Sequence, residues 1–341
     1  MITRLIMTVG AVFCVSAEAA TVVIVTDQPK QVKAKEVVSV LKTTPPFSRL
    51  KSFDLRIIST KTSTLGCDAA PLVALNLAAM KSNLRSEDAL AYFESVDRLS
   101  RIHSNAKNLK ADPTPASCVG EKAKPVRLIT CDTPKARRYL GGVKAAHGAD
   151  FVLVVLNLNR YGGSGGVYPV ITTGSPATMM VHEFMHQLGF ADEYAYLNAC
   201  EADTYCDLQA GDTKSKSGYG SLPGTSFNVA LFNSFNSYID DQDVKNRHAT
   251  SIPWVNSIAT TTPLQVSGKI GTPSSLGKVG LYQTIVCERA SRRLDTWQSV
   301  PQSTIMKALS TNYVPDVYWN TIAKSLGTRL LKAPVAGEKV F

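Results

Sequence analysis

The order of apolar and polar positions predicts strands that alternate with helices in the first half of the chain. Apolar, β-branched runs at 21–26 and 53–59 are typical of strands, and the almost continuous run at 151–158 predicts a central strand buried on both faces. Helical spacing occurs between them, at 31–41 and 134–146. Because alternating strands and helices build parallel sheets with crossover helices, we predict an α/β fold with a mostly parallel sheet.

The pattern then predicts an edge strand followed by a helix. Residues 167–172 have strand character but contain Pro169, which confines a strand to the edge of a sheet. A Ser-Pro pair at 175–176 predicts a helix start with the serine as N-cap. The helix extends from about 177 to 188 and ends at Gly189, since glycine commonly terminates helices.

The hydrophobic patterns in the rest of the chain are weaker. Turn residues dominate from 198 to 280, where little regular structure is expected. The other expected elements are a strand at 126–130, a strand or helix at 72–80, and helices at 87–109, 291–299 and 316–326.

The predicted helix carries a metal-binding pattern. His182 and His186 are four residues apart, so both imidazoles project from one face and can bind one metal ion. Glu183 is placed to accept a proton from a zinc-bound water. Gly189 permits a sharp turn, after which Asp192 returns toward the metal as the third ligand, where metzincins carry a histidine. We therefore predict one catalytic Zn²⁺.

Other residues are candidates for the same zinc site. Met306 follows a polar turn far downstream and is predicted to be the methionine of a Met-turn beneath the metal. His248 is an alternative third ligand, because catalytic zinc ligands also come from distant positions. His103 and His147 are interpreted as surface residues. Tyr313 either approaches the oxyanion or is a core tyrosine.

The N-terminus predicts export. Arg4, the apolar segment 5–15 and the small residues Ala17 and Ala19 match a secretory signal peptide cleaved after Ala19. Alternatives are a short buried helix or a membrane anchor. We predict a secreted or periplasmic protein with a signal peptide at 1–19.

Six cysteines remain after this cleavage, an even number that suggests disulfides in an exported chain. Six cysteines allow about fifteen pairings, so proximity in sequence is the only guide. The expected pairs are Cys200 with Cys206, Cys118 with Cys131 and, by elimination, Cys67 with Cys287.

Charge and hydropathy limit the partners. The net charge is +10, but lysines and arginines are scattered, which favours a solvated surface over a nucleic-acid interface. No apolar run reaches the roughly 18–20 residues that span a bilayer. We expect a monomer that acts on a protein or peptide substrate, with no nucleic acid and no stable membrane insertion.

The motif resembles a known family. Residues 182–194 (HEFMHQLGFADEY) are similar to the signature of the M64 peptidases, metzincin-like enzymes that include a bacterial immunoglobulin A peptidase. Weaker similarity extends over 45–55, 151–166 and 280–306. The chain departs from the family at 26–29 and at Met185, where glycine is common, so immunoglobulin cleavage is not carried over.

This resemblance implies a metzincin-like catalytic domain over 20–341, with subdomains at about 20–189 and 190–341. It implies a twisted, mostly parallel sheet with one antiparallel edge strand, an active-site helix, and a loop-rich C-terminal part with a Met-turn. The activity implied is that of a secreted zinc endopeptidase whose edge strand, predicted at 167–172, pairs with the substrate. Glu193 and Tyr194 would orient the loop or support the ligands; the alternative is that both are ordinary surface residues.

Two other functions remain open. One is a secreted, non-catalytic binding protein with a structural or degenerate zinc site. The other is a zinc hydrolase that acts on amides outside proteins. Glu183 favours an enzyme, because a structural site does not need this carboxylate.

Overall fold

A computed structural model describes residues 19–69, 129–131, 133–159, 161–195, 227–232, 252, 254–258, 279–280, 282–289 and 295–326. Several predictions lie outside these residues: the signal peptide before residue 19, the elements at 72–80 and 87–109, the Cys200–Cys206 pair, and both His103 and His248.

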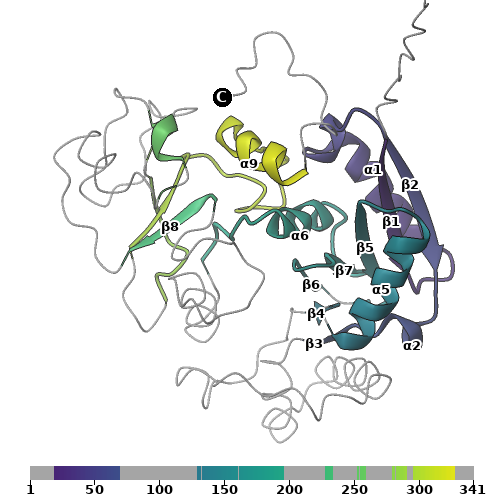
Figure 1. The fold of residues 1–341 in the computed structure, drawn as a ribbon. Coiled ribbons are helices and arrows are strands. Elements are labelled where there is room, and N and C mark those ends of the chain that lie inside the picture. The colour runs from purple at the N-terminus through teal and green to yellow at the C-terminus, as the bar shows by residue number, and fades with distance from the viewer. Residues whose placement is uncertain are drawn as a thin grey trace, which may run out of the picture.

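A five-stranded sheet, the central sheet of the α/β fold, lies toward the right of Figure 1. Its order is β2-β1-β5-β7-β6, and every neighbouring pair is parallel except β6 with β7. The mixed α/β class and the mostly parallel sheet are therefore confirmed. The strands are β1 (Ala20–Thr26), β2 (Phe53–Ser59), β5 (Phe151–Leu156), β6 (Gly163–Ser164) and β7 (Val170–Thr172).

The antiparallel edge strand is β6, and the prediction of an edge strand at 167–172 was wrong. Strand β7 lies between β5 and β6, so both of its sides are paired. Pro169 precedes the strand, and its carbonyl accepts a hydrogen bond from Val154 N at 2.9 Å. Because the proline lies outside β7 and uses only its carbonyl, its missing N–H removes no bond from the sheet.

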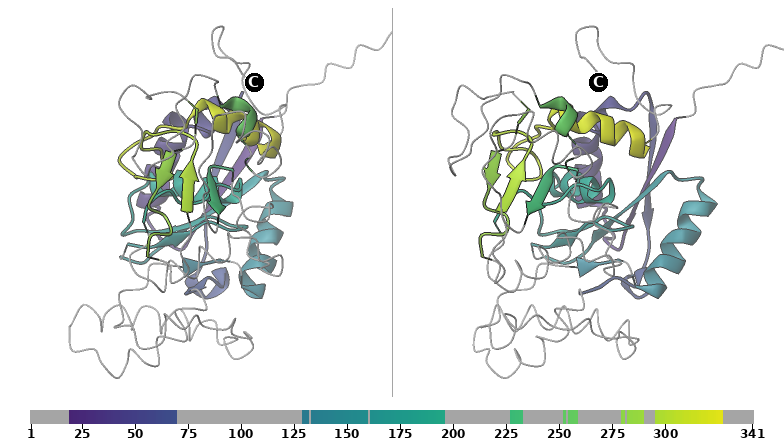
Figure 2. Two further views of the ribbon diagram at one scale, coloured as in Figure 1. Left: turned by 90° about the vertical axis from the view of Figure 1, so that its left-hand side faces the viewer. Right: turned by 60° about the vertical axis from the view of Figure 1, so that its left-hand side comes forward.

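Helices cover both faces of the sheet (Figures 1 and 2). Alternate residues of β1 enter different apolar clusters, with Val22 and Ile24 on one face and Val23 and Val25 on the other. Side chains that alternate between two cores explain why β1 is apolar on both of its faces. The first cluster packs against α1 (Val32–Thr43), α6 (Met179–Gln187) and α9 (Asp316–Leu326), and the second against α5 (Pro134–Ala146).

A second, antiparallel sheet has the order β8-β10-β9. Its strands are β8 (Val229–Phe232), β9 (Tyr282–Thr284) and β10 (Asp295–Gln298). The helix predicted at 291–299 was wrong, because its second half is β10. Thr296 and Trp297 both favour strands, and burial of Trp297 against Trp254 and its neighbours outweighs the local helical spacing.

Short elements complete the described fold. The strand predicted at 126–130 is described only as β4 (Ile129–Thr130), which pairs with β3 (Asp68–Ala69). The others are α2 (Thr62–Leu65) and the 3-10 turns η1 (Phe47–Arg49) and η4 (Val255–Ser257).

A disulfide joins Cys67 to Cys131. Both predicted pairs that involve these residues, Cys118 with Cys131 and Cys67 with Cys287, were therefore wrong. Cys287 is also disulfide-bonded. Strands β3 and β4 align Asp68 with Thr130, which brings the adjoining cysteines together across 64 residues of sequence. Proximity in the sequence gave no indication of this pairing.

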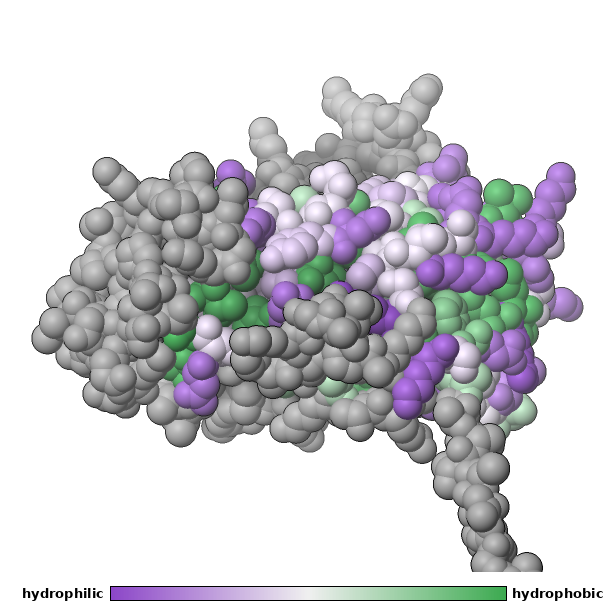
Figure 3. All heavy atoms as spheres, turned by 90° about the horizontal axis from the view of Figure 1, so that it is seen from above, coloured by the Kyte–Doolittle hydropathy of each residue, from purple (hydrophilic) through white to green (hydrophobic). Residues whose placement is uncertain are grey.

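The described surface is mixed in character. Figure 3 shows hydrophilic side chains between apolar ones on the face seen from above. The large apolar side chains that are exposed are dispersed along the sequence, as is common on protein surfaces: Val32, Tyr161, Val167, Ile285 and Tyr313. Among the described residues, no helix has both the length and the apolar character needed to cross a membrane.

Candidate metal site

Helix α6 is buried over all but its last residue and holds the two histidines firmly. Residues 179–186 are all buried, and the helix lies between the central sheet and α9. Its first residue is Met179, two positions later than predicted, and Thr178 is its N-cap residue. Ser175, the predicted N-cap, instead accepts a hydrogen bond from Gly162 N at 2.9 Å and donates to Gly162 O at 2.8 Å. The serine thus anchors the chain that leads into β6.

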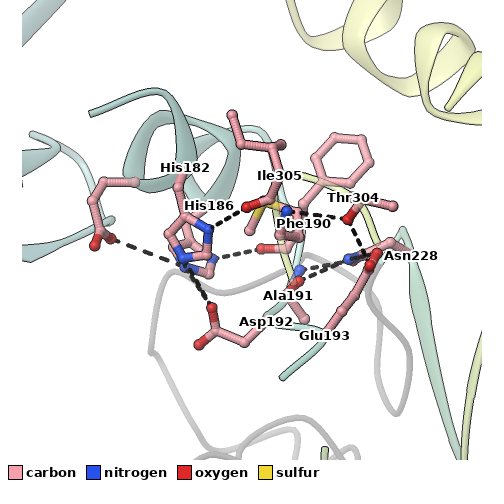
Figure 4. A network of polar contacts seen from close by, with 11 residues as sticks. His182, His186, Phe190, Ala191, Asp192, Glu193, Asn228, Thr304 and Ile305 are labelled. Carbon is pink, nitrogen blue, oxygen red and sulfur yellow. Dashed lines mark hydrogen bonds and ion pairs between the residues drawn. The ribbon is translucent and has the colours of Figure 1, made fainter. Parts of the chain in front are cut away.

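Three buried side chains converge at the end of this helix (Figure 4). Asp192 Oδ1 lies 3.0 Å from His182 Nε2 and 3.2 Å from His186 Nε2, and the two Nε2 atoms are 3.2 Å apart. His182, His186 and Asp192 together form a group able to hold a metal ion. The structure therefore brings together the three residues that the sequence predicted as ligands.

The donor set and its spacing fit zinc. Zinc bonds of about 2.0–2.1 Å in a tetrahedral arrangement place ligand atoms about 3.3 Å from one another. The three separations here, 3.0–3.2 Å, lie close to that value. Two imidazoles and one carboxylate are also a common protein donor set for catalytic zinc.

The Nδ1 atom of each imidazole is hydrogen-bonded to a main-chain carbonyl. His182 Nδ1 donates to the carbonyl of Ile305 at 2.9 Å, and His186 Nδ1 donates to the carbonyl of Phe190 at 2.7 Å. A carbonyl only accepts, so the proton of each neutral ring resides on Nδ1. Each Nε2 is then the atom that offers a lone pair to a metal.

The short contacts between Asp192 and the histidines shift the pKa values of Asp192 and His186. Burial opposes charge on the Asp192 carboxyl, but His186 and His182 outweigh it and hold the pKa of Asp192 well below its usual range. Burial likewise opposes protonation of His186, but the Asp192 carboxylate outweighs it and raises the pKa of His186. The site therefore holds its carboxylate in the charged form that binds cations.

Glu183 lies beside the three ligands, outside their triangle. It is buried, and its Oε2 is 4.0 Å from His186 Nε2, farther than the ligand atoms are from one another. On its other side, a Cβ atom at Gly163 would lie 3.2 Å from Glu183 Oε1. The carboxylate is thus located between the ligand cluster and the edge strand β6.

Glycines allow the edge strand to approach the helix. A Cβ at Gly165 would lie 2.3 Å from His186 Cβ, and one at Gly163 would lie 2.6 Å from the carbonyl of Val170. Real Cβ atoms do not come so close to other atoms. The glycine-rich segment 161–166 therefore contains a buried strand fitted against α6.

Gly189 permits the turn that brings Asp192 back to the histidines. Its φ of 94° lies in the region that favours glycine, and a Cβ there would meet Phe227 Cε2 at 2.5 Å. The predicted role of Gly189 in a sharp turn after the helix matches this geometry.

Glu193 is fully buried and joins three distant segments. Its Oε2 accepts a hydrogen bond from Thr304 Oγ1 at 2.6 Å, and its Oε1 accepts from Asn228 Nδ2 at 2.9 Å and from the hydroxyl of Tyr318. Burial raises the pKa of Glu193 even though these hydrogen bonds favour its charged form. Burial and the nearby Glu193 also raise the pKa of Tyr318.

Met306 belongs to the turn that contacts the site. Its side chain is buried in the same cluster as α6, and its carbonyl accepts from Glu193 N at 3.0 Å. The preceding residue, Ile305, supplies the carbonyl that holds His182. The turn therefore lies against both the helix and the ligand loop.

The other residues considered for the site are Tyr194, Tyr313 and His147, and each lies in a different part of the structure. The ring of Tyr194 stacks on that of His182, with centroids 6.0 Å apart. Tyr313 is 37% exposed, so it is not a core tyrosine. Its carbonyl accepts from Ile305 N at 3.0 Å, which places its main chain beside the turn. His147 is partly buried at the end of α5.

Sequence reasoning missed the polar residues that support the ligand loop. Asn228, Thr304 and Tyr318 come from segments between 35 and 125 residues away from Glu193. Each is an ordinary residue type in its local context, so no spacing rule marks it. Only the fold shows that the three side chains meet.

No protein-family model matches this chain, and no curated protein matches its sequence. The resemblance to M64 peptidases consequently rests on the motif residues and on the weaker similarity around them.

Proposed function

We propose that the protein is a zinc-dependent peptidase of the M64 type that hydrolyses peptide bonds. The observation that carries the proposal is the convergence of His182, His186 and Asp192 with the Glu183 carboxylate directly beside them. A structural zinc site needs no such carboxylate, whereas hydrolysis needs a group that moves protons.

Each residue has a distinct task. The two imidazoles and Asp192 would hold the metal, and zinc, when bound, supplies Lewis acidity toward a scissile carbonyl and a water molecule. Glu183 accepts the proton of the attacking water and delivers it to the leaving amine. Its separation of 4.0 Å from His186 Nε2 suits a proton carrier better than a fourth ligand.

The edge strand β6 supports an extended peptide as the substrate. It is the outer strand of the sheet, and its backbone passes beside Glu183. An extended peptide can add to a sheet edge through main-chain hydrogen bonds, which require no particular side chain. A substrate aligned with β6 would thus have its backbone close to the proton carrier.

We further propose that the protein acts outside the cytoplasm, as a secreted or periplasmic monomer. The signal-peptide pattern before Ala20 supports export. The Cys67–Cys131 disulfide also supports it, because such bonds persist mainly in oxidising compartments.

Casein hydrolysis by the purified protein tests the activity. We expect cleavage with zinc present, loss of cleavage with a chelator, and recovery when zinc is restored. Glu183→Ala should lower the rate by about 10²–10⁴-fold because the proton carrier is lost. The exposed Glu288 provides the control, and Glu288→Ala should cleave at the wild-type rate.

Zinc content must be measured for each variant. A zinc-loaded wild type that cleaves no faster than Glu183→Ala on several proteins would contradict the proposal. That outcome would favour a non-catalytic zinc protein, or a hydrolase of other amides.

A further inference from the structure

Asn228 contacts the ligand loop on both sides of Asp192. Its Oδ1 accepts a hydrogen bond from Ala191 N at 2.7 Å, and its Nδ2 donates to Ala191 O at 2.7 Å and to Glu193 Oε1 at 2.9 Å. Asp192 lies between the two residues that this side chain holds. Figure 4 shows the amide facing the loop from the side opposite α6.

The contacts require an amide in one orientation. A primary amide offers two donors and an acceptor, and here both donors face acceptors while the oxygen faces an N–H. Rotating the amide by half a turn would place its NH₂ against the N–H of Ala191. The side chain therefore pairs with Ala191 as a neighbouring strand would, satisfying both of its buried backbone groups.

The residue before Asn228 holds the beginning of the same loop. The ring of Phe227 fills the space beside Gly189, where a Cβ would meet it at 2.5 Å, and it also packs against Phe190 with centroids 6.0 Å apart. Strand β8 follows directly, and β10 pairs with it. The second sheet thus anchors Phe227 and Asn228, and these two residues hold the loop between α6 and Glu193.

We infer that Asn228 is a positioning residue that sets the zinc affinity of the site through Asp192. This inference rests on the metal site of the proposed function. Asp192 Oδ1 must stay within about 3 Å of two Nε2 atoms at once, and metal ligands have to be held to within roughly 0.5 Å. Asn228 thus fixes the main chain of the residue before this ligand and the side chain of the residue after it.

Metal titration of the full chain tests the role. Asn228→Leu keeps the size of the side chain and removes its hydrogen bonds, so we expect Zn²⁺ to bind about 10–100-fold more weakly, as for other residues that orient ligands. With Co²⁺ as the probe, the d–d absorption should change, because it reports the geometry of the ligands. A loss of stability alone would leave both readouts unchanged in the folded protein.

A matched control comes from the same sheet. Gln298 on β10 is equally buried, and its amide donates to Val300 O at 2.7 Å, within its own segment. Gln298→Met likewise removes a buried amide and should retain the wild-type zinc affinity. Asn228→Asp provides a second test should the leucine variant not fold, since it keeps the shape and loses both donors.

The outcomes separate this inference from the proposed function. Wild-type zinc affinity in a folded Asn228 variant, or equal weakening in Gln298→Met, would overturn the inference while leaving the peptidase proposal intact. Weakened zinc binding in the Asn228 variants of a chain that cleaves no protein would support the inference and overturn the peptidase.

Discussion

At the scale of single residues, the site depends on a few backbone positions as much as on its ligands. The sequence predicted His182, His186 and Asp192 because their spacing follows from helix geometry and one glycine turn. It did not predict Asn228, since the contact with Ala191 spans 37 residues and uses a common polar side chain. Local periodicity identifies ligands on one helix, whereas long-range contacts depend on the completed fold.

Gly189→Ala should destabilise the protein. An alanine at a φ of 94° costs about 1–2 kcal/mol, and its Cβ would also displace Phe227. Urea unfolding measures the change. Gly142 in α5 provides the control, because a Cβ there meets nothing within 4 Å and Gly142→Ala should stabilise by about 0.5–1 kcal/mol. Equal stability of Gly189→Ala and the wild type would contradict the proposed turn requirement.

At the scale of elements, the strongest patterns were predicted well and the shortest were not. The strand at 53–59 and the helix at 316–326 have the expected bounds. Strand β10 and the edge strand β6 were missed because each is short and defined by its partners. A two-residue strand of glycine and serine has no periodicity; only its pairing with β7 makes it a strand.

Gly165→Ala should separate β6 from α6. Its Cβ would lie 2.3 Å from His186 Cβ, so either the strand or the helix must shift, at a cost of about 1–3 kcal/mol. We expect weaker zinc binding as well, because His186 would move with the helix. Calorimetric zinc titration and urea unfolding measure both effects. Gly141→Ala in α5, where the new Cβ would make an ordinary 3.5 Å contact, should leave zinc binding unchanged and should not destabilise the protein.

At the scale of the whole molecule, one apolar cluster unites segments from both ends of the chain. It contains Val22 of β1, Phe184 of α6 and Tyr318 of α9. Residues on both sides of position 190 belong to it, so the helix that carries the histidines shares one core with Ile305 and Met306. The alternation of strands and helices predicted the central sheet, but nothing in the local pattern predicted how the C-terminal helix docks on it.

Zinc should stabilise the whole fold. A ligand that binds only the folded state at about 100 times its Kd adds roughly 2.7 kcal/mol, and the site joins α6 to the loop that the second sheet holds. Thermal unfolding should therefore occur at a higher temperature with zinc than with a chelator. Glu183→Ala should keep this shift because the ligands remain, whereas Asp192→Ala should lose most of it. Identical melting temperatures with zinc and chelator would argue against the site.

The two carbonyls that hold the imidazoles have a consequence for how this site tolerates mutation. Ile305 and Phe190 offer their main-chain oxygens to His182 and His186, and every amino acid carries such an oxygen. A substitution at either position changes the side chain and leaves the acceptor in place. The backbone thus determines the tautomer of both histidines. A point mutation at either accepting residue does not directly remove the hydrogen bond to the imidazole.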